Sequence, residues 1–301
     1  MTLFDAYVMV DWSANARPKT RWDSVWYSVL TRERGGAVPT CRNPATRQRA
    51  IEEITGILGG FSERKVPTLI GFDFPYGYPS GFANALGLSG KIPWRAVWDA
   101  IAARIEDHED NSNNRFETAA EFNRKVLGGP FPFWGCPPNR QSTTLTSRKV
   151  QPFTAGTLPE YRLTDRRAKA KGAQPVWKLY GPGAPGSQAL LGIPYVAKLR
   201  TDPRFDTVSR VWPFETLLEP LACREQRDWA ILHAEIFPSL VLSRAEPGEI
   251  RDEAQVRNLA EYFARLDEEG ELGNLFDCPA GITDEDRSMA ESEEGWILGI
   301  Q

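Results

Sequence analysis

Leu69-Ile70-Gly71-Phe72-Asp73-Phe74-Pro75-Tyr76-Gly77 is the stretch that decides the fold of this chain. Apolar and small residues lead to Asp73, and Pro75 and Gly77 then turn the chain, which predicts a buried strand that ends at Asp73. The chain begins in the same way, with apolar residues 7–10 followed by Asp11. Open α/β sheets bind their ligands at the carboxyl ends of the strands. The two stretches therefore predict an α/β fold with a site at Asp11 and Asp73.

Hydrophobic periodicity predicts the remaining elements. Residues 22–30 are rich in aromatic and β-branched residues and predict a second strand, antiparallel to the first. A short third strand near residues 37–40 and a helix over residues 47–58 follow. The later predicted elements are helices over residues 93–107, 115–127, 187–199 and 252–266 and strands over residues 208–214 and 231–237.

Residues 78–205 differ from the rest of the chain because several stretches within them are rich in Pro and Gly. We interpret them as a mostly helical and loop insertion that caps the sheet edge, within a single domain spanning residues 1–301. Their aromatic side chains are expected to pack in the core rather than to form a base-stacking surface.

Composition limits the chemistry. The 301 residues include 41% hydrophobic and 25% charged residues, as in ordinary globular proteins, and no apolar run is long enough to span a membrane. Without a signal-peptide pattern at residues 1–5, the expectation is a cytoplasmic protein. Four scattered cysteines and two histidines argue against zinc clusters and most catalytic zinc sites, and no G-x-S-x-G motif is present. Carboxylates are therefore the favoured catalytic groups.

Two further carboxylates join Asp11 and Asp73 as candidates. Glu235 lies on a mostly apolar face of the strand predicted over residues 231–237, where a carboxylate is costly unless it is paired or bound to a cation. Asp252 lies on the apolar stripe of the last long helix, although an aspartate there also suits a helix N-terminus. The set predicts a site for Mg²⁺ or Mn²⁺, two of which, about 4 Å apart, can cleave a phosphodiester. The structural alternative is that strand-end aspartates bond backbone N–H groups in turns.

Four other residues form a second tier of candidates. Glu215 follows a predicted strand, and His233 is a candidate for proton transfer or a packed core histidine. Ser13 and Lys19 follow the first strand, where each is suited to contact a phosphate or simply to form a turn and an exposed surface.

Residues 139–178 are rich in Lys and Arg, whereas the chain after Arg224 is strongly acidic. The basic segment predicts a polyanion-binding face, or a solvated surface that pairs with the acidic one. The predicted phosphate contacts are Arg140, Arg148, Lys149 and Arg162.

The carboxylate motifs also resemble a known family. Asp11, residues 70–77, residues 234–239, Asp252 and residues 294–299 together resemble the DUF429 family. That resemblance implies a ribonuclease H-like fold with a mixed five-stranded sheet and a predicted nuclease activity. It also implies that Asp11, Asp73, Glu235 and Asp252 form the acidic site. The long insertion departs from the family pattern.

The leading hypothesis is a metal-dependent nuclease or phosphodiesterase with a nucleic acid or nucleotide substrate. One alternative is a nucleotide-binding or phosphotransfer enzyme of the actin and sugar-kinase kind, which shares a related core but normally doubles it. Some relatives of this length also resemble proteins labelled with molybdopterin-guanine dinucleotide synthesis, a label that no residue here supports directly. Neither a Walker A motif nor a G-x-G-x-x-G after a strand is present. The other alternative is a non-catalytic interaction protein on the same fold.

Overall fold

A mixed six-stranded sheet organises the part of the chain that the computed structural model describes, namely residues 2–32, 38–88, 90–150, 153, 158–221, 223–241 and 244–301. In spatial order the strands are β3 (Thr40–Arg42), β2 (Trp26–Thr31), β1 (Ala6–Asp11), β4 (Thr68–Phe72), β6 (Ile231–Glu235) and β5 (Ser209–Val211). β2 is antiparallel to β1 and β3, whereas β1, β4, β6 and β5 are parallel. The predicted α/β class with a mixed sheet is confirmed. The implied five-strand count is wrong, because β5 adds a sixth strand beside β6.

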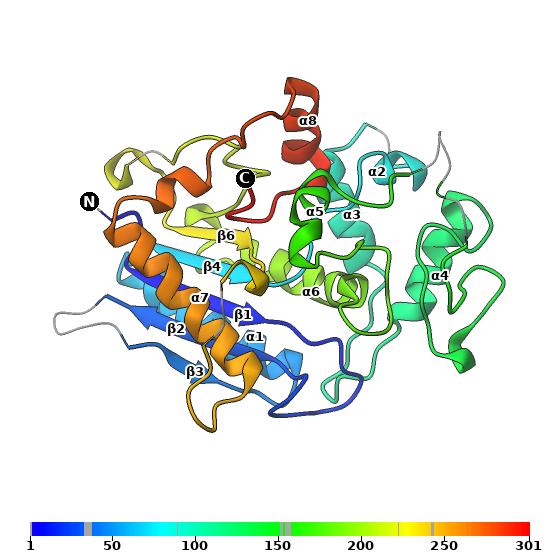
Figure 1. Cartoon of the computed structure of the whole chain (residues 1–301), viewed down its shortest axis with the longest axis horizontal. Helices are drawn as coiled ribbons and strands as arrows, with labels where there is room; N and C mark the ends of the chain where they lie inside the picture. The colour runs from blue at the N-terminus through cyan, green and yellow to red at the C-terminus, as the bar shows by residue number, and fades with distance from the viewer. Residues whose placement is uncertain are drawn as a thin grey trace.

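The central strands are buried because helices cover both faces of the sheet. Alternate side chains of a strand point to opposite faces, and in β1 Val8 and Val10 pack in one apolar cluster while Tyr7 and Met9 pack in the other. The first cluster includes α1 (Arg47–Glu63), and the second includes α7 (Arg251–Glu268). Figure 1 shows α7 across the front of the sheet and α1 behind it.

The predicted helices are present, with shifted ends. Short helices were not predicted, and the predicted helix over residues 93–107 ends early. The remaining α-helices are α2 (Phe82–Ala85), α3 (Pro93–Ala102), α4 (Arg115–Val126), α5 (Leu163–Ala168), α6 (Pro185–Arg200) and α8 (Asp284–Met289). Short 3-10 helices span Pro138–Arg140, Lys169–Lys171, Asp206–Val208, Arg224–Gln226, Pro238–Leu240 and Leu272–Leu275, and a π-helical turn spans Ala290–Glu294.

Several strands differ from their predicted ranges. β2 begins at Trp26 and not at residue 22, and β6 ends at Glu235 and not at residue 237. The third strand was predicted near residues 37–40, of which Ala37 lies outside the described residues, and β3 runs over Thr40–Arg42. The strand predicted over residues 208–214 ends at Val211, two residues before Pro213, which has no N–H for the ladder. No helix in the described ranges is both long enough and apolar enough to cross a membrane.

The segment over residues 78–205 lies beyond the carboxyl ends of β1 and β4 (Figure 1) and carries α2 to α6. Most of its aromatic side chains share one apolar cluster with the α1 face of the sheet, whereas Tyr180 is exposed. Gly192 of α6 allows this packing, because a Cβ there would overlap the ring of Phe74, just after β4. Helix α6 therefore packs directly against the chain that follows β4, next to Asp73.

We predict that Gly77→Ala destabilises the protein by about 1–3 kcal/mol, the usual cost of overpacking. A Cβ on Gly77 would overlap the backbone carbonyl oxygens of Glu293 and Glu294, which cannot move as a side chain can. Gly60→Ala in α1 is the matched control, since no atom lies within 4 Å of its Cβ position, and alanine should gain up to about 1 kcal/mol there. Urea unfolding of both variants measures the difference, and equal stabilities would contradict the packing described.

Candidate functional site

Asp11 and Asp73 meet at the carboxyl ends of two neighbouring strands. The parallel pairing of β1 with β4 places Val10 opposite Phe72. The next residues along the two strands, Asp11 and Asp73, therefore lie side by side. The Asp73 N–H donates to the Val10 carbonyl at 3.1 Å, and the Trp12 N–H donates to Asp73 Oδ1 at 2.7 Å. The two carboxyl groups lie close enough for each to affect the pKa of the other. The structure thus brings together the two carboxylates that the sequence placed first.

The environment of this pair favours protonation. Desolvation by the surrounding protein raises the pKa of Asp11 well above its usual range, and the nearby Asp73, Asp252 and Asp23 carboxylates raise it further. Desolvation also raises the pKa of Asp73 to about 7, against the opposing effects of the hydrogen bond from Trp12 N and of Asp11. The pair therefore shares a proton near neutral pH, as closely spaced carboxylates do.

Asp252 lies in the first turn of α7 and belongs to the same group. Its Oδ2 accepts a hydrogen bond from the Asp23 N–H at 2.8 Å, in the loop between β1 and β2. No side chain caps the N-terminus of α7, where Ile250 is the N-cap residue. The Asp252 carboxylate binds the β1–β2 loop and not the N-terminus of its own helix. Its charge is close enough to raise the pKa of both Asp11 and Asp73.

Glu235 is separated from this group by its partners. Both of its carboxylate oxygens bind Arg162, at 2.6 and 2.7 Å, and Oε2 also accepts the Tyr76 N–H at 2.9 Å. Arg162 is fully buried and binds Asp165 as well. The cost of burying Glu235 is thus offset by an arginine. The predicted cation at Glu235 and the predicted phosphate contact at Arg162 do not match this arrangement, because each side chain is the other's counter-ion.

Glu215 and His233 lie away from the strand ends of β1 and β4. Glu215 binds Arg200 at 2.7 Å and Arg95 at 3.3 Å beside β5. His233 is fully buried in β6, where its Nε2 lies 2.8 Å from Ser209 Oγ. Burial lowers the pKa of His233 to about 3, which leaves it neutral at physiological pH. It is therefore a packed histidine and not a proton donor at the Asp11–Asp73 pair.

The carboxylate group opens into a cleft of about 870 Å³ between the sheet and the insertion. Ser13 lies in its wall, and the Ser13 Oγ donates to the Asp23 carbonyl at 3.2 Å. Lys19 forms an exposed ion pair with Asp23 at 3.2 Å and does not line the cleft. The cleft is lined by residues 11–16, 23–24, 179–184 and 251–252 together with Arg115, Ser187, Gln188 and Gln255. Asp73 faces an adjoining cavity of about 190 Å³, which shares Gly183 and Gln188 with the cleft.

The predicted phosphate contacts lie outside this cleft. Arg140 pairs with Glu117 at 2.5 Å, Lys149 pairs with Glu160 at 2.8 Å, and Arg148 is exposed elsewhere. The arginines that do line the cleft are Arg115 and Arg251, neither of which the sequence analysis singled out. One signal for Arg115 was present, because an arginine at the first position of a helix opposes the helix dipole.

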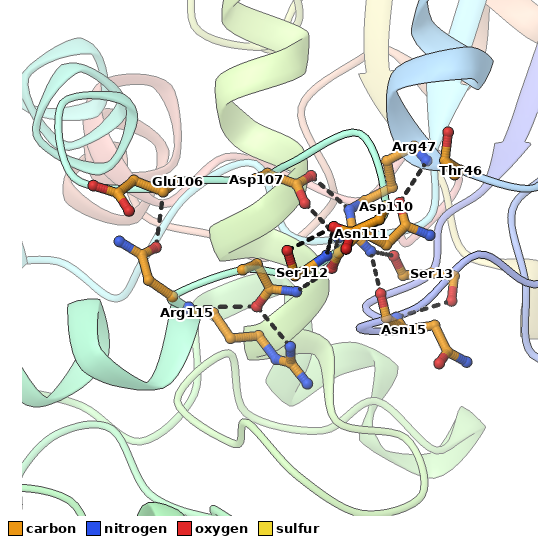
Figure 2. A network of polar contacts seen from close by, with 12 residues as sticks. Ser13, Asn15, Thr46, Arg47, Glu106, Asp107, Asp110, Asn111, Ser112 and Arg115 are labelled. Carbon is orange, nitrogen blue, oxygen red and sulfur yellow. Dashed lines mark hydrogen bonds and ion pairs between the residues drawn. The ribbon is translucent and has the colours of Figure 1, made fainter.

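A second buried arginine holds the wall of the cleft in place. Arg47, at the start of α1, donates to the backbone carbonyls of Ser13 at 3.0 Å and Asn15 at 2.7 Å. Its other nitrogens bind the Asp107 carboxylate and the Asn111 carbonyl, as Figure 2 shows. The loop after β1 is therefore tied to both α1 and the insertion.

The donor set fits a hard cation only in part. Within the described ranges, no group of three or more His, Cys, Asp or Glu side chains is arranged to hold a metal ion. Mg²⁺, however, is commonly bound by one or two carboxylates together with waters and substrate phosphates. Asp11 and Asp73 supply such a pair of oxygen donors, and Asp252 is the next carboxylate.

Comparison of the chain with protein-family models, with curated proteins and with solved structures found no significant match. The assignment of a function therefore depends on the site itself.

We predict that Arg162→Met destabilises the protein by about 3–5 kcal/mol, because it leaves Glu235 and Asp165 as buried charges without a partner. Arg148→Met is the control, since Arg148 is exposed and forms no ion pair among the described residues. Adding Glu235→Gln to Arg162→Met should recover part of the loss, which a pure packing defect would not allow. Chemical denaturation of the three variants decides between the two causes.

Proposed function

We propose that this chain is a metal-dependent phosphodiesterase with a ribonuclease H-like core, in which Asp11 and Asp73 bind Mg²⁺ or Mn²⁺. The observation that carries the proposal is the juxtaposition of two carboxyl groups at adjacent strand ends, where the 2.7 Å bond from Trp12 N holds Asp73. Two carboxylates held so close repel each other when both are ionised. A divalent cation removes that repulsion and takes oxygen ligands of this kind.

The architecture supports the proposal. The element order β1-β2-β3-α1-β4 with β2 antiparallel is the order that the resemblance to the DUF429 family implies, and β6 followed by α7 corresponds to its last strand and helix. The strand β5 and the insertion are additions to that core. Asp252 remains in the proposed acidic set, and Glu235 leaves it because of its bond to Arg162.

The residues have separable tasks in this proposal. Asp11 and Asp73 would hold the cation in place of their shared proton, and the N–H groups of Trp12 and Asp23 keep the Asp73 and Asp252 carboxylates in position. A bound cation would lower the pKa of water and offset the charge on a phosphate. The Arg47 contacts to Ser13 and Asn15 keep the loop after β1 at the edge of the cleft.

We predict that Asp73→Asn abolishes cleavage while the protein stays folded. Asparagine keeps an oxygen that can accept the Trp12 N–H but loses the charge that a cation needs. Cleavage should be measured on single- and double-stranded DNA, RNA, an RNA–DNA hybrid and dinucleotides, with Mg²⁺ or Mn²⁺. Asp99→Asn, an exposed aspartate on α3, is the control and should cleave like wild type. Metal-dependent cleavage by a folded Asp73→Asn variant would contradict the proposal.

We also predict a pH-dependent stability that metal reverses. The pKa of Asp73 is about 7 in the folded protein and near 3.8 in the unfolded chain, so the folded state binds more protons between these values. The metal-free protein should therefore lose stability as the pH rises from about 4 to 7. Asp73→Asn should weaken this loss, so that its Tm exceeds that of wild type most clearly at pH 8.

The same titration predicts how metal binds. Mg²⁺ or Mn²⁺ should raise the Tm of wild type more at pH 8 than at pH 5.5, because the cation must displace the shared proton. Asp73→Asn should show no such rise. A thermal-shift series over pH with and without metal measures both effects, and equal metal shifts in wild type and variant would contradict them.

A further inference from the structure

Carboxylates gather on one side of the cleft. The end of β1, the loop after it and the start of α7 contribute Asp11, Asp23 and Asp252 together with the exposed Arg251, whereas the insertion contributes Arg115. Arg115 is the first residue of α4, and its guanidinium points away from the Arg47–Asp107 pair in Figure 2. The insertion therefore places a cation at the same cleft into which the carboxylates open.

Arg115 is fixed by neutral groups alone. Its Nε donates to Ser187 Oγ at 2.9 Å, its Nη1 donates to Asn113 Oδ1 at 2.7 Å, and its guanidinium lies 4.4 Å from the centre of the Phe116 ring. Ser187 in turn donates to the Leu179 carbonyl at 2.6 Å. Within the described part of the chain, no carboxylate comes within ion-pair distance of Arg115.

Arg115 differs in its partners from the two buried arginines, Arg47 and Arg162. Arg47 and Arg162 each bind a carboxylate, as a buried charge requires. Burial lowers the pKa of Arg115 to about 10, with the neighbouring Arg47 and Arg140 adding to the effect, so it remains protonated at neutral pH. A part-buried, protonated and preorganised guanidinium without a counter-ion is suited to bind an anion from solution.

The cleft indicates which anion. Its volume of about 870 Å³ lies within the range of about 300–1,000 Å³ for small-molecule sites, which suits a nucleotide or a short strand. Tyr180, on the same wall as Arg115, is 54% exposed and offers a ring on which a base can stack. Guanidinium groups recognise phosphate through paired hydrogen bonds.

We propose that Arg115 is the phosphate-binding residue of this cleft and holds a phosphate of a nucleotide or a short single-stranded nucleic acid against the insertion, with Tyr180 stacking on a base. The inference rests on the proposed function for the identity of the reacting phosphate at Asp11 and Asp73. The binding step itself needs no cleavage. Ser187 and Asn113 are positioning residues, because each holds the guanidinium without touching the ligand.

The test measures binding and cleavage separately. Binding of 5′-phosphorylated dithymidylate and of a fluorescent oligothymidylate is titrated in EDTA, where no cleavage occurs, for wild type, Arg115→Gln, Arg115→Lys and Tyr180→Ala. Arg124→Gln is the matched control, since Arg124 is an exposed residue of the same helix with no ion pair among the described residues and does not line the cleft. Melting temperatures establish that each variant is folded.

Arg115→Gln should weaken binding at least tenfold and reduce the slope of log K against log salt concentration by about 0.7–1, the value for one lost phosphate contact. Arg115→Lys should fall between wild type and Arg115→Gln, and Arg124→Gln should match wild type. Tyr180→Ala should weaken binding of both nucleotide probes without changing the salt slope, because stacking involves no phosphate. If Arg115→Gln is folded and binds as wild type does, or keeps the wild-type slope, the inference is overturned.

The two proposals can fail independently. Binding that depends on Arg115 in a protein that cleaves nothing would support the phosphate site and reject the phosphodiesterase. Metal-dependent cleavage lost in Asp73→Asn but unchanged in Arg115→Gln, together with unchanged binding, would retain the phosphodiesterase and reject the phosphate site. Asp73→Asn should itself bind the probes about as tightly as wild type, because Asp73 faces the adjoining cavity and not the cleft, and the Asp11–Asp73 pair with its shared proton already carries a single negative charge.

Discussion

The ion pair between Arg162 and Glu235 is the interaction on which the rest of this structure depends. It joins the insertion to β6 across the edge of the sheet, and Asp165 completes the charge balance around the guanidinium. The C-terminal segment reinforces the same junction, because the Glu294 carboxylate accepts the N–H groups of Leu163 at 2.6 Å and Ser80 at 2.8 Å. Segments far apart in the chain are thus held together by buried charges whose partners are all satisfied. Arg162, Asp165 and Glu235 line the cavity that adjoins the cleft and that Asp73 faces.

Arg162, Arg47 and Arg115 show how one residue type serves different roles. Arg162 and Arg47 are buried with carboxylate partners, and breaking such a pair leaves a buried charge that costs several kcal/mol. Arg162 holds the insertion against β6, and Arg47 holds the loop after β1 against α1. Arg115 has the same chemistry but only Ser187 and Asn113 as partners, so its charge remains available to a ligand. The three arginines differ in role because their neighbouring side chains differ.

The same contrast separates the carboxylates. Asp11 and Asp73 were predictable, because an acidic residue after a buried parallel strand reaches the ligand-binding edge whatever the rest of the chain does. Glu235 satisfied the same local argument, since it too is an acidic residue on a buried strand. Its role was decided by Arg162, which lies in a segment that sequence analysis assigned to phosphate contacts. The argument that a buried glutamate must be paired or bound to a cation was sound, but only the fold shows which of the two applies.

Local sequence was enough to predict the mixed α/β class, the placing of Asp11 and Asp73 at the ends of buried strands and the long helix with Asp252 at its start, because these depend on periodicity and turn residues within a few positions. Tertiary contacts were needed to establish the place of β5 beside β6, the partner of Glu235, the burial of Arg162 and the position of Arg115 at the cleft. Each of these depends on contacts between segments many residues apart, such as the 73 positions between Arg162 and Glu235. Local sequence patterns indicate which charged side chains are buried and need a partner. The partner itself is known only from the tertiary structure.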